Sequence, residues 1–79
     1  IFVGGGLSEN LLEQLETHFD AGTRVVINCV TLEAEALLVA WQSRKGGELM
    51  RVEISETKPL GAKRGWSAAY PVVQWAGQL

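Results

Sequence analysis

The sequence predicts an α/β fold that forms half of an open, doubly wound sheet and ends in an antiparallel hairpin. Three observations predict it. Apolar strand-like runs alternate with helix-like segments over residues 1–47, one seven-residue run is almost entirely apolar, and two further strand-like segments have no helical segment between them. The expected order is β-α-β-α-β-β. With 79 residues, the chain is expected to be one domain with a small core.

The first strand and helix are predicted at the beginning of the chain. Ile1 to Val3 are β-branched or aromatic and lead into glycines, which is typical of a strand followed by a turn. Either Ser8 or Asn10 can cap the helix that follows, and Asn10 with Glu13 has the spacing of a capping box. Its expected apolar face consists of Leu11, Leu12, Leu15 and Phe19.

The second strand and helix are predicted within residues 24–47. The run "RVVINCV" is nearly all apolar, which is typical of a central, parallel strand covered on both faces. Thr31 is expected to cap the next helix, and Glu33 and Glu35 suit its first turn, where the helix dipole favours negative charge. Gly46-Gly47 is expected to end this helix. Its apolar residues are Leu32, Leu37, Leu38 and Trp41.

Two final strands are predicted in "ELMRVEISE" and "YPVVQW". The first alternates, with Met50, Val52 and Ile54 on one face. Because no helix separates the two segments, they are expected to pair antiparallel, and the stretch between them is expected to be a long loop.

Composition narrows the classes of function. The net charge of −2 gives no overall reason to expect a nucleic-acid partner. Cys29 is the only cysteine, so a disulfide framework is excluded, no metal site is expected, and the residue is interpreted as a small core hydrophobe. No apolar run approaches the ~20 residues that span a bilayer, so no membrane partner is expected, and a cytoplasmic location is the simplest interpretation.

The chain begins inside an apolar strand and without Met, so we expect a piece of a longer protein. Truncation would leave Ile1 to Val3 as an apolar edge strand, and such edges recruit partners. A homo-oligomer is therefore expected.

A ligand in an open α/β sheet lies beyond the carboxyl ends of the parallel strands. Two segments meet this condition: the turn Gly4, Gly5 and Gly6, and the stretch that contains Asn28, Thr31 and Glu33. Glycines allow a ligand to approach the backbone closely, and a helix N-terminus offers free N–H groups. The alternatives remain open: the glycines form a plain tight turn, Thr31 is only a cap, and Asn28 pairs with neighbouring backbone.

A second candidate site is the cationic, aromatic stretch "PLGAKRGW". It contains Lys63, Arg64, Gly65 and Trp66, and with Lys58 it holds three of the seven basic residues. A solvated hairpin tip is the alternative interpretation. The other two tryptophans are expected in the core, and His18 on the surface.

Three stretches together resemble one known family: "IFVGGG" with its helix, "NCVTLEAEALL", and "PLGAKRGWSAAYPVVQW". They resemble the C-terminal half of the methyltransferase domain of the decarboxylating precorrin-6Y C5,15-methyltransferases of cobalamin biosynthesis. The resemblance covers residues 1–79, read as a single partial domain. It implies a Rossmann-like class I fold with these residues as strands four to seven, the last inserted antiparallel between the fifth and sixth.

The resemblance also implies a function. Such an enzyme uses S-adenosylmethionine to methylate a carbon of an anionic tetrapyrrole, with loss of carbon dioxide from an acetate arm. Lys63, Arg64, Gly65 and Trp66 would then bind the tetrapyrrole. The turn and the acidic residue that grip the cofactor belong to the other half of the domain, so this piece alone is expected to be inactive. Two alternatives are a non-catalytic binding or self-assembly domain, and a domain that binds a nicotinamide dinucleotide, for which no G-x-G-x-x-G fingerprint is present.

Overall fold

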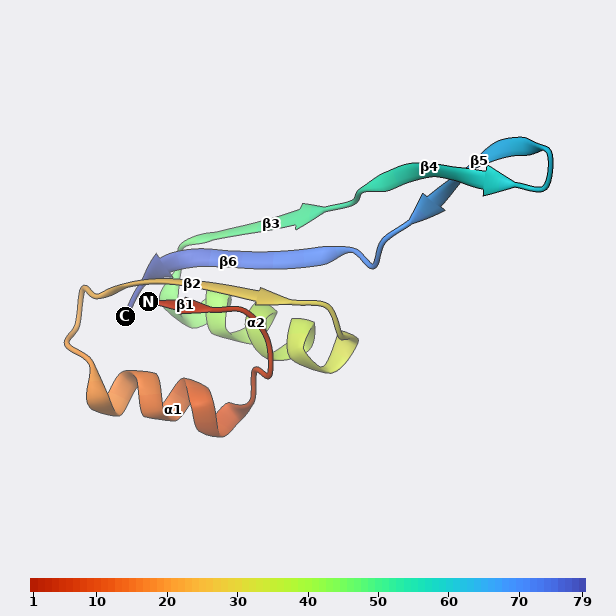
Figure 1. Ribbon diagram of the computed structural model, residues 1–79. Coiled ribbons are helices and arrows are strands. Elements are labelled where there is room, and N and C mark those ends of the chain that lie inside the picture. Colours follow the sequence, from red (N-terminus) through yellow and green to blue (C-terminus); the bar gives the residue numbers. More distant parts are fainter.

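The computed structural model describes residues 1–79, and its element order extends the expected one by two strands (Figure 1). A strand and a helix alternate twice and are followed by four strands. The elements are β1 (Phe2–Val3), α1 (Glu9–His18), β2 (Arg24–Cys29), α2 (Leu32–Lys45), β3 (Glu48–Val52), β4 (Ser55–Leu60), β5 (Lys63–Ala68) and β6 (Val72–Gln78).

Four of the strands form the main sheet, in the order β1-β2-β6-β3. β1 and β2 are parallel, whereas β6 runs antiparallel to both of its neighbours, β2 and β3. The final strand is therefore inserted antiparallel between two strands that precede it, as expected. No helix of this chain combines the length and the apolar character needed to span a membrane.

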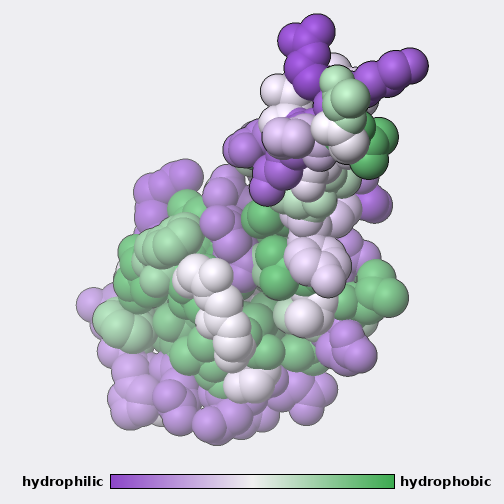
Figure 2. Space-filling model, turned by 45° about the vertical axis from the view of Figure 1, so that its right-hand side comes forward, coloured by the Kyte–Doolittle hydropathy of each residue, from purple (hydrophilic) through white to green (hydrophobic).

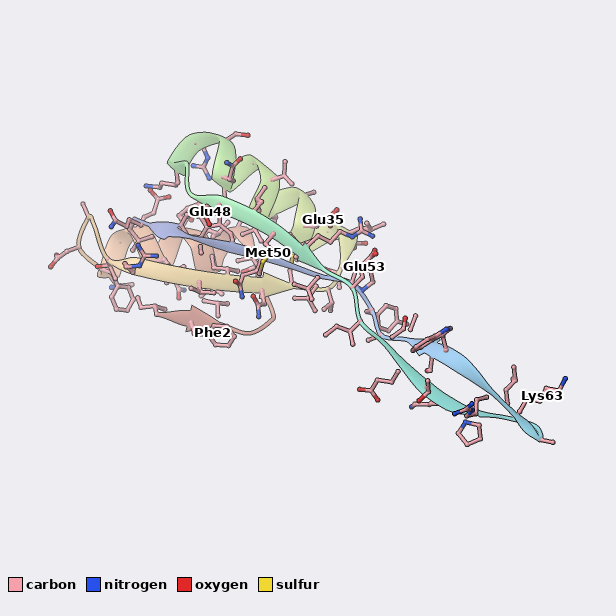
Figure 3. All side chains as sticks on the ribbon, turned by 90° about the horizontal axis from the view of Figure 1, so that it is seen from above. Phe2, Glu35, Glu48, Met50, Glu53 and Lys63 are labelled. Atoms are coloured by element: carbon pink, nitrogen blue, oxygen red, sulfur yellow. The ribbon has the colours of Figure 1, made fainter.

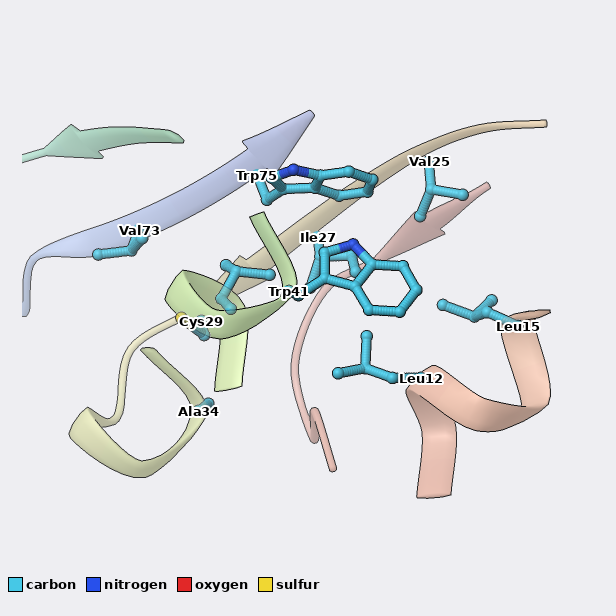
Figure 4. Close-up of a cluster of buried hydrophobic side chains, with 10 residues drawn as sticks. Leu12, Leu15, Val25, Ile27, Cys29, Ala34, Trp41, Val73 and Trp75 are labelled. Atoms are coloured by element: carbon cyan, nitrogen blue, oxygen red, sulfur yellow. The ribbon is translucent and has the colours of Figure 1, made fainter. Parts of the chain in front are cut away.

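Both helices cover the same face of this sheet (Figure 1). Alternate residues of β2 and β6 point toward them and are buried, because successive side chains of a strand face opposite sides. The ten residues of this core are Leu12, Leu15, Val25, Ile27, Cys29, Ala34, Leu38, Trp41, Val73 and Trp75 (Figure 4). On the opposite face, Phe2 and Met50 are exposed, and this chain provides no layer over them. The expectation that β2 is covered on both faces is therefore not met within the chain.

Two tryptophans lie at the centre of the core. Trp41 and Trp75 are both fully buried, and their rings meet edge to face with centroids 5.7 Å apart. The Nε1 of Trp75 donates a hydrogen bond to the backbone carbonyl of Gly46. Arg44 and Lys45 cover the outer side of the Trp41 ring, with their cationic groups 5.4 and 5.3 Å from its centroid.

The ends of the helices follow local chemistry. Ser8, not Asn10, caps α1 by accepting a hydrogen bond from the Leu11 N–H, and Thr31 caps α2 by accepting one from the Ala34 N–H. Gly46 ends α2 with a φ of 71°. One prediction at a helix end is wrong: Phe19, expected on the apolar face of α1, is the C-cap and is 47% exposed. Leu32, the first residue of α2, is 79% exposed.

β4 and β5 form a separate two-stranded hairpin, which we call the arm (residues 55–68). The expectation of a long loop here is wrong, because the two segments pair with each other from Ser55↔Ala68 to Leu60↔Lys63. Gly61, with a φ of 61°, allows the two-residue turn at the tip. The arm projects from the body, and the chain measures 55 × 20 × 19 Å (Figure 1).

Candidate functional site

The carboxyl ends of the two parallel strands bring the first candidate residues to one edge of the sheet. Gly4, Gly5 and Gly6 follow β1, and the segment from Asn28 to Glu33 closes β2 and opens α2. The register pairs Val3 with Ile27, so the two segments leave the sheet from neighbouring strands. We call these residues the carboxyl edge.

The three glycines differ in what they could accommodate. A Cβ at Gly5 would meet no heavy atom within 4 Å, and Gly5 does not have a positive φ. Gly6 has a φ of 71°, which disfavours any side chain. At Gly4 a Cβ would lie 3.2 Å from the Phe2 ring. The turn thus leaves open space above Gly5, the condition for a close approach of a ligand to the backbone.

Asn28 finds its partner on the neighbouring strand. Its Oδ1 accepts a 2.8 Å hydrogen bond from Nε2 of Gln74, the residue directly opposite on β6. Both side chains are half-buried on the sheet face that the helices leave uncovered. Sequence reasoning missed Gln74. The even spacing of Val72, Gln74 and Ala76 along β6 was the available signal, but the strand register was needed to place Gln74 opposite Asn28.

Of the polar residues around the start of α2, Thr31 has a structural role, whereas the glutamates are at least partly exposed. The hydroxyl of Thr31 is engaged as the helix cap, which is the simpler of the two interpretations offered by the sequence. Glu33 is exposed and Glu35 is half-buried, both in the first turn of α2. Nearby, burial raises the pKa of the Cys29 thiol, and the negative charge of Glu35 raises it further. Cys29 is therefore a neutral core residue, as expected.

Little space is enclosed at this edge. A cavity of about 110 Å³ lies between the start of α2 and the base of the arm, and Glu35 and Arg51 are among its lining residues. Ligand pockets are typically about 300–1,000 Å³, so this chain alone does not enclose a site for a large ligand.

The second group of candidate residues lies on the arm, within β5. Side chains alternate along a strand, so Arg64 and Trp66 share one face of the arm, with Pro59 and Thr57 opposite them on β4. Lys63 and Gly65 belong to the other face. The four residues therefore do not converge on one surface: Arg64 and Trp66 come together, and Lys63 lies at the far end of the arm (Figure 3).

The Arg64–Trp66 face is open to solvent. Trp66 is 77% exposed, and every residue of β4 is exposed as well. Figure 2 shows the arm standing out from the body, with hydrophilic side chains at its far end. The other tryptophans are in the core, and His18 is an exposed residue at the end of α1, as expected.

Comparison with known proteins finds one family model that matches nearly the whole chain. The model of the family described as "Precorrin methyltransferase domain" matches residues 1–78. A precorrin-6Y C(5,15)-methyltransferase [decarboxylating] of Sinorhizobium sp is 42% identical over 77 residues, which are 96% of this chain and 19% of that protein. The chain thus spans about a fifth of the length of the curated relatives that it matches.

Two solved structures of proteins with the same named activity are similar to this chain in both sequence and fold. The C-terminal domain of precorrin-6Y C5,15-methyltransferase from Rhodobacter capsulatus is 49% identical, with a TM-score of 0.92 over 99% of this chain and 42% of that one. A targeted domain of a Corynebacterium diphtheriae protein of the same name is 32% identical, with a TM-score of 0.89 over 98% of this chain and 46% of that one. The family match over residues 1–78 and the structural similarity together show that the chain belongs to the precorrin methyltransferase domain family.

Proposed function

We propose that this chain is the second half of the methyltransferase domain of a decarboxylating precorrin-6Y C5,15-methyltransferase in cobalamin biosynthesis. The observation that carries the proposal is the family match over residues 1–78. The strand order supports it, because β6 lies antiparallel between β2 and β3, the arrangement expected for strands four to seven of a class I methyltransferase.

The proposed cofactor is S-adenosylmethionine, which supplies a methyl group made electrophilic by its sulfonium. The carboxyl edge fits a role beside it: the space above Gly5 admits a ligand, and the backbone there is not covered by side chains. Asn28 and Glu33 would add polar groups at the same edge, and Thr31 would act by holding the start of α2 in place.

The proposed substrate is an anionic tetrapyrrole. One of its ring carbons would attack the methyl group, and the macrocycle would take up the electron pair released when the acetate arm loses carbon dioxide. This chemistry requires the protein to orient the reactants and exclude water, not to supply a nucleophile. On the arm, Arg64 would hold a carboxylate through two parallel hydrogen bonds and Trp66 would offer a flat face to the macrocycle. Lys63, next to Gly65, would add charge from the other face.

The test uses the full-length protein that contains this chain. Purified protein is incubated with precorrin-6Y and S-adenosylmethionine labelled at the methyl carbon, and the product is analysed by mass spectrometry while released carbon dioxide is trapped. We expect incorporation of label and release of carbon dioxide. Folded protein that incorporates no label and releases no carbon dioxide would contradict the proposal and favour a non-catalytic role.

We further propose that the protein acts in the cytoplasm as a homo-oligomer. Both edges of the arm are unpaired, and Leu60 and Trp66 on it are 69% and 77% exposed. The outer edge of β1 is free in this chain, but the other half of the proposed domain would pair with it. Unpaired strand edges with apolar side chains recruit other chains. Analytical ultracentrifugation of the full-length protein tests this, and a monomer at high micromolar concentration would contradict it.

A further inference from the structure

The carboxyl edge carries negative charge and lacks a free cation. Outside the arm the chain has four cations and eight carboxylates, net −4, whereas the arm has three cations and one carboxylate, net +2. Glu33 and Glu35 lie at this edge, and the nearby Arg51 is already paired with Glu53 at 2.9 Å. The other three body cations are Arg24 at the amino end of β2, and Arg44 and Lys45 at the last turn of α2, which is the opposite end of the sheet.

A substrate with several carboxylates therefore meets repulsion from this part of its site, and its countercharges must come from elsewhere. Within this chain they are on the arm. Yet the arm projects from β3 and β6, on the other side of the sheet from β1. At about 3.4 Å per residue, the stretch from Val52 to Leu60 reaches roughly 25 Å beyond the end of β3. Figure 3 shows that the arm continues the direction of the strands and places Lys63 far from Phe2.

The arm also lacks a surface of its own to pack against. Its strands pair only with each other, and a two-stranded hairpin alone is marginally stable in water. Large apolar side chains are nevertheless exposed on it and at its base: Leu60 at 69%, Trp66 at 77%, Tyr70 at 82% and Ile54 at 57%. Such exposure indicates a surface that another molecule covers.

We infer that the arm acts in trans: Arg64 and Trp66 of one copy complete the tetrapyrrole site at the carboxyl edge of a second copy. The partner is a second copy of this chain because the positive arm is complementary to the carboxyl edge, where Glu33 and Glu35 lie and the nearby Arg51 is paired with Glu53. The arm extends away from β1 and the glycine turn of its own chain, so it is better placed to reach the carboxyl edge of another copy than its own. This inference rests on the proposed function, since it assigns the cations to the carboxylates of that substrate.

The decisive experiment is complementation in mixed oligomers of the full-length enzyme. One copy carries Arg64→Gln with Trp66→Ala, which removes the binding groups but keeps the arm backbone. The other copy carries Gly5→Val, which fills the space at the carboxyl edge without adding a positive-φ strain. The two copies bear different affinity tags, are co-expressed, and are purified through both tags in succession, so that only mixed oligomers are assayed.

With both substrates below their KM values, each variant alone is expected to lose at least tenfold in the rate of methyl transfer, whereas the mixed oligomer regains activity. In a mixed symmetric dimer, about half of the sites would combine an intact edge with an intact arm. The reciprocal control places all three substitutions in one copy and pairs it with wild type. Action in trans predicts that this oligomer is inactive. A mixed oligomer that stays inactive, with a reciprocal control at half activity, would overturn the inference and assign the arm to its own copy.

A second measurement does not depend on activity. A photoreactive amino acid in place of Trp66 is introduced into full-length protein that is mixed with isotope-labelled copies. Illumination should join the arm to a labelled peptide from the carboxyl edge of the other copy. Crosslinks confined to one copy, or an active wild-type monomer, would overturn the inference. The wild-type assay separates this failure from that of the proposed function, because it tests methyl transfer without reference to which copy supplies the arm.

Discussion

The indole Nε1 of Trp75 donates a 2.8 Å hydrogen bond to the carbonyl oxygen of Gly46, which ties the last strand to the end of the last helix. The next residue, Gly47, lies against the same indole. A Cβ there would be 2.7 Å from the carbonyl oxygen of Ala76 and 2.8 Å from Nε1 of Trp75. The connection between α2 and β3 is therefore specified by contact as well as by backbone conformation.

Replacing Gly47 should consequently destabilise the protein more than replacing Gly46. Both glycines have positive φ, 82° and 71°, but a Cβ at Gly46 would meet no atom within 4 Å. We expect Gly47→Ala to lower the free energy of unfolding by about 2–4 kcal/mol and Gly46→Ala by about 1 kcal/mol, since only the first adds a clash to the strain. Urea denaturation of both variants measures the difference, and equal losses would show that the contact with Trp75 is unimportant.

The pair of Asn28 and Gln74 should be energetically coupled. Their hydrogen bond spans 2.8 Å between half-buried side chains, so removing either one leaves the other without its partner. In a double-mutant cycle of Asn28→Ala and Gln74→Ala, we expect a coupling energy of about 0.5–1.5 kcal/mol. Thermal or chemical unfolding of the four proteins provides the values. Strict additivity would mean that solvent or another part of the protein replaces the bond at no cost.

Stability should fall at alkaline pH through Cys29. Burial, helped by the charge of Glu35, raises the pKa of this thiol, so the folded state holds the proton more tightly than the unfolded state. The stabilisation is complete below the unfolded pKa of about 8.5 and is lost as the pH rises through the folded pKa. We expect the free energy of unfolding to decline more steeply above about pH 8.5 in wild type than in Cys29→Ala. The free energy of unfolding is measured as a function of pH for both proteins. The same slope above about pH 8.5 in wild type and in Cys29→Ala would contradict this linkage.

The main sheet could be predicted from the sequence because its signals are local and strong. The apolar run of β2, the cap at Thr31 and the glycines after α2 each specify an element without knowledge of the rest. Phe19 fits the helical periodicity of the apolar face of α1, yet it is exposed because the helix ends before it. Helical periodicity shows which face of a helix packs against the sheet, but it does not show at which residue that packing ends.

The arm could not be predicted in the same way. Its segments contain Pro59, Lys58 and Gly65, which have low strand propensity, and the turn at Gly61-Ala62 is not one of the strong hairpin dipeptides. Side chains alternate between two faces only in a strand, so the expectation of a loop gave no reason to separate Arg64 and Trp66 from Lys63. The carboxyl edge, in contrast, followed from a general rule about parallel strands, and its role in binding stays a prediction.

Gly5 offers a test of that edge. Because a side chain fits there without a clash, Gly5→Val in the full-length enzyme should leave the melting temperature within a few degrees of wild type. If a ligand approaches the backbone at this turn, the same change should raise the KM for S-adenosylmethionine or for the tetrapyrrole by about tenfold or more. Steady-state kinetics with each substrate varied identify which one is affected. If the variant is stable and both KM values equal those of wild type, the glycines form a plain turn and do not bind a ligand.

Arg64 offers the corresponding test of the arm. A charged hydrogen bond to a carboxylate is worth about 1.5–3 kcal/mol, so Arg64→Ala should raise the KM for the tetrapyrrole by about tenfold or more and leave that for S-adenosylmethionine unchanged. Lys58→Ala is the matched control. It removes the same charge from the same hairpin, but Lys58 lies opposite Gly65 on the other face, away from Trp66. Equal effects of the two substitutions would indicate general attraction of the anion by the positive arm, because a direct contact depends on the face whereas long-range attraction does not. If neither constant changes in either variant, the cations of the arm are solvated and the arm serves assembly alone.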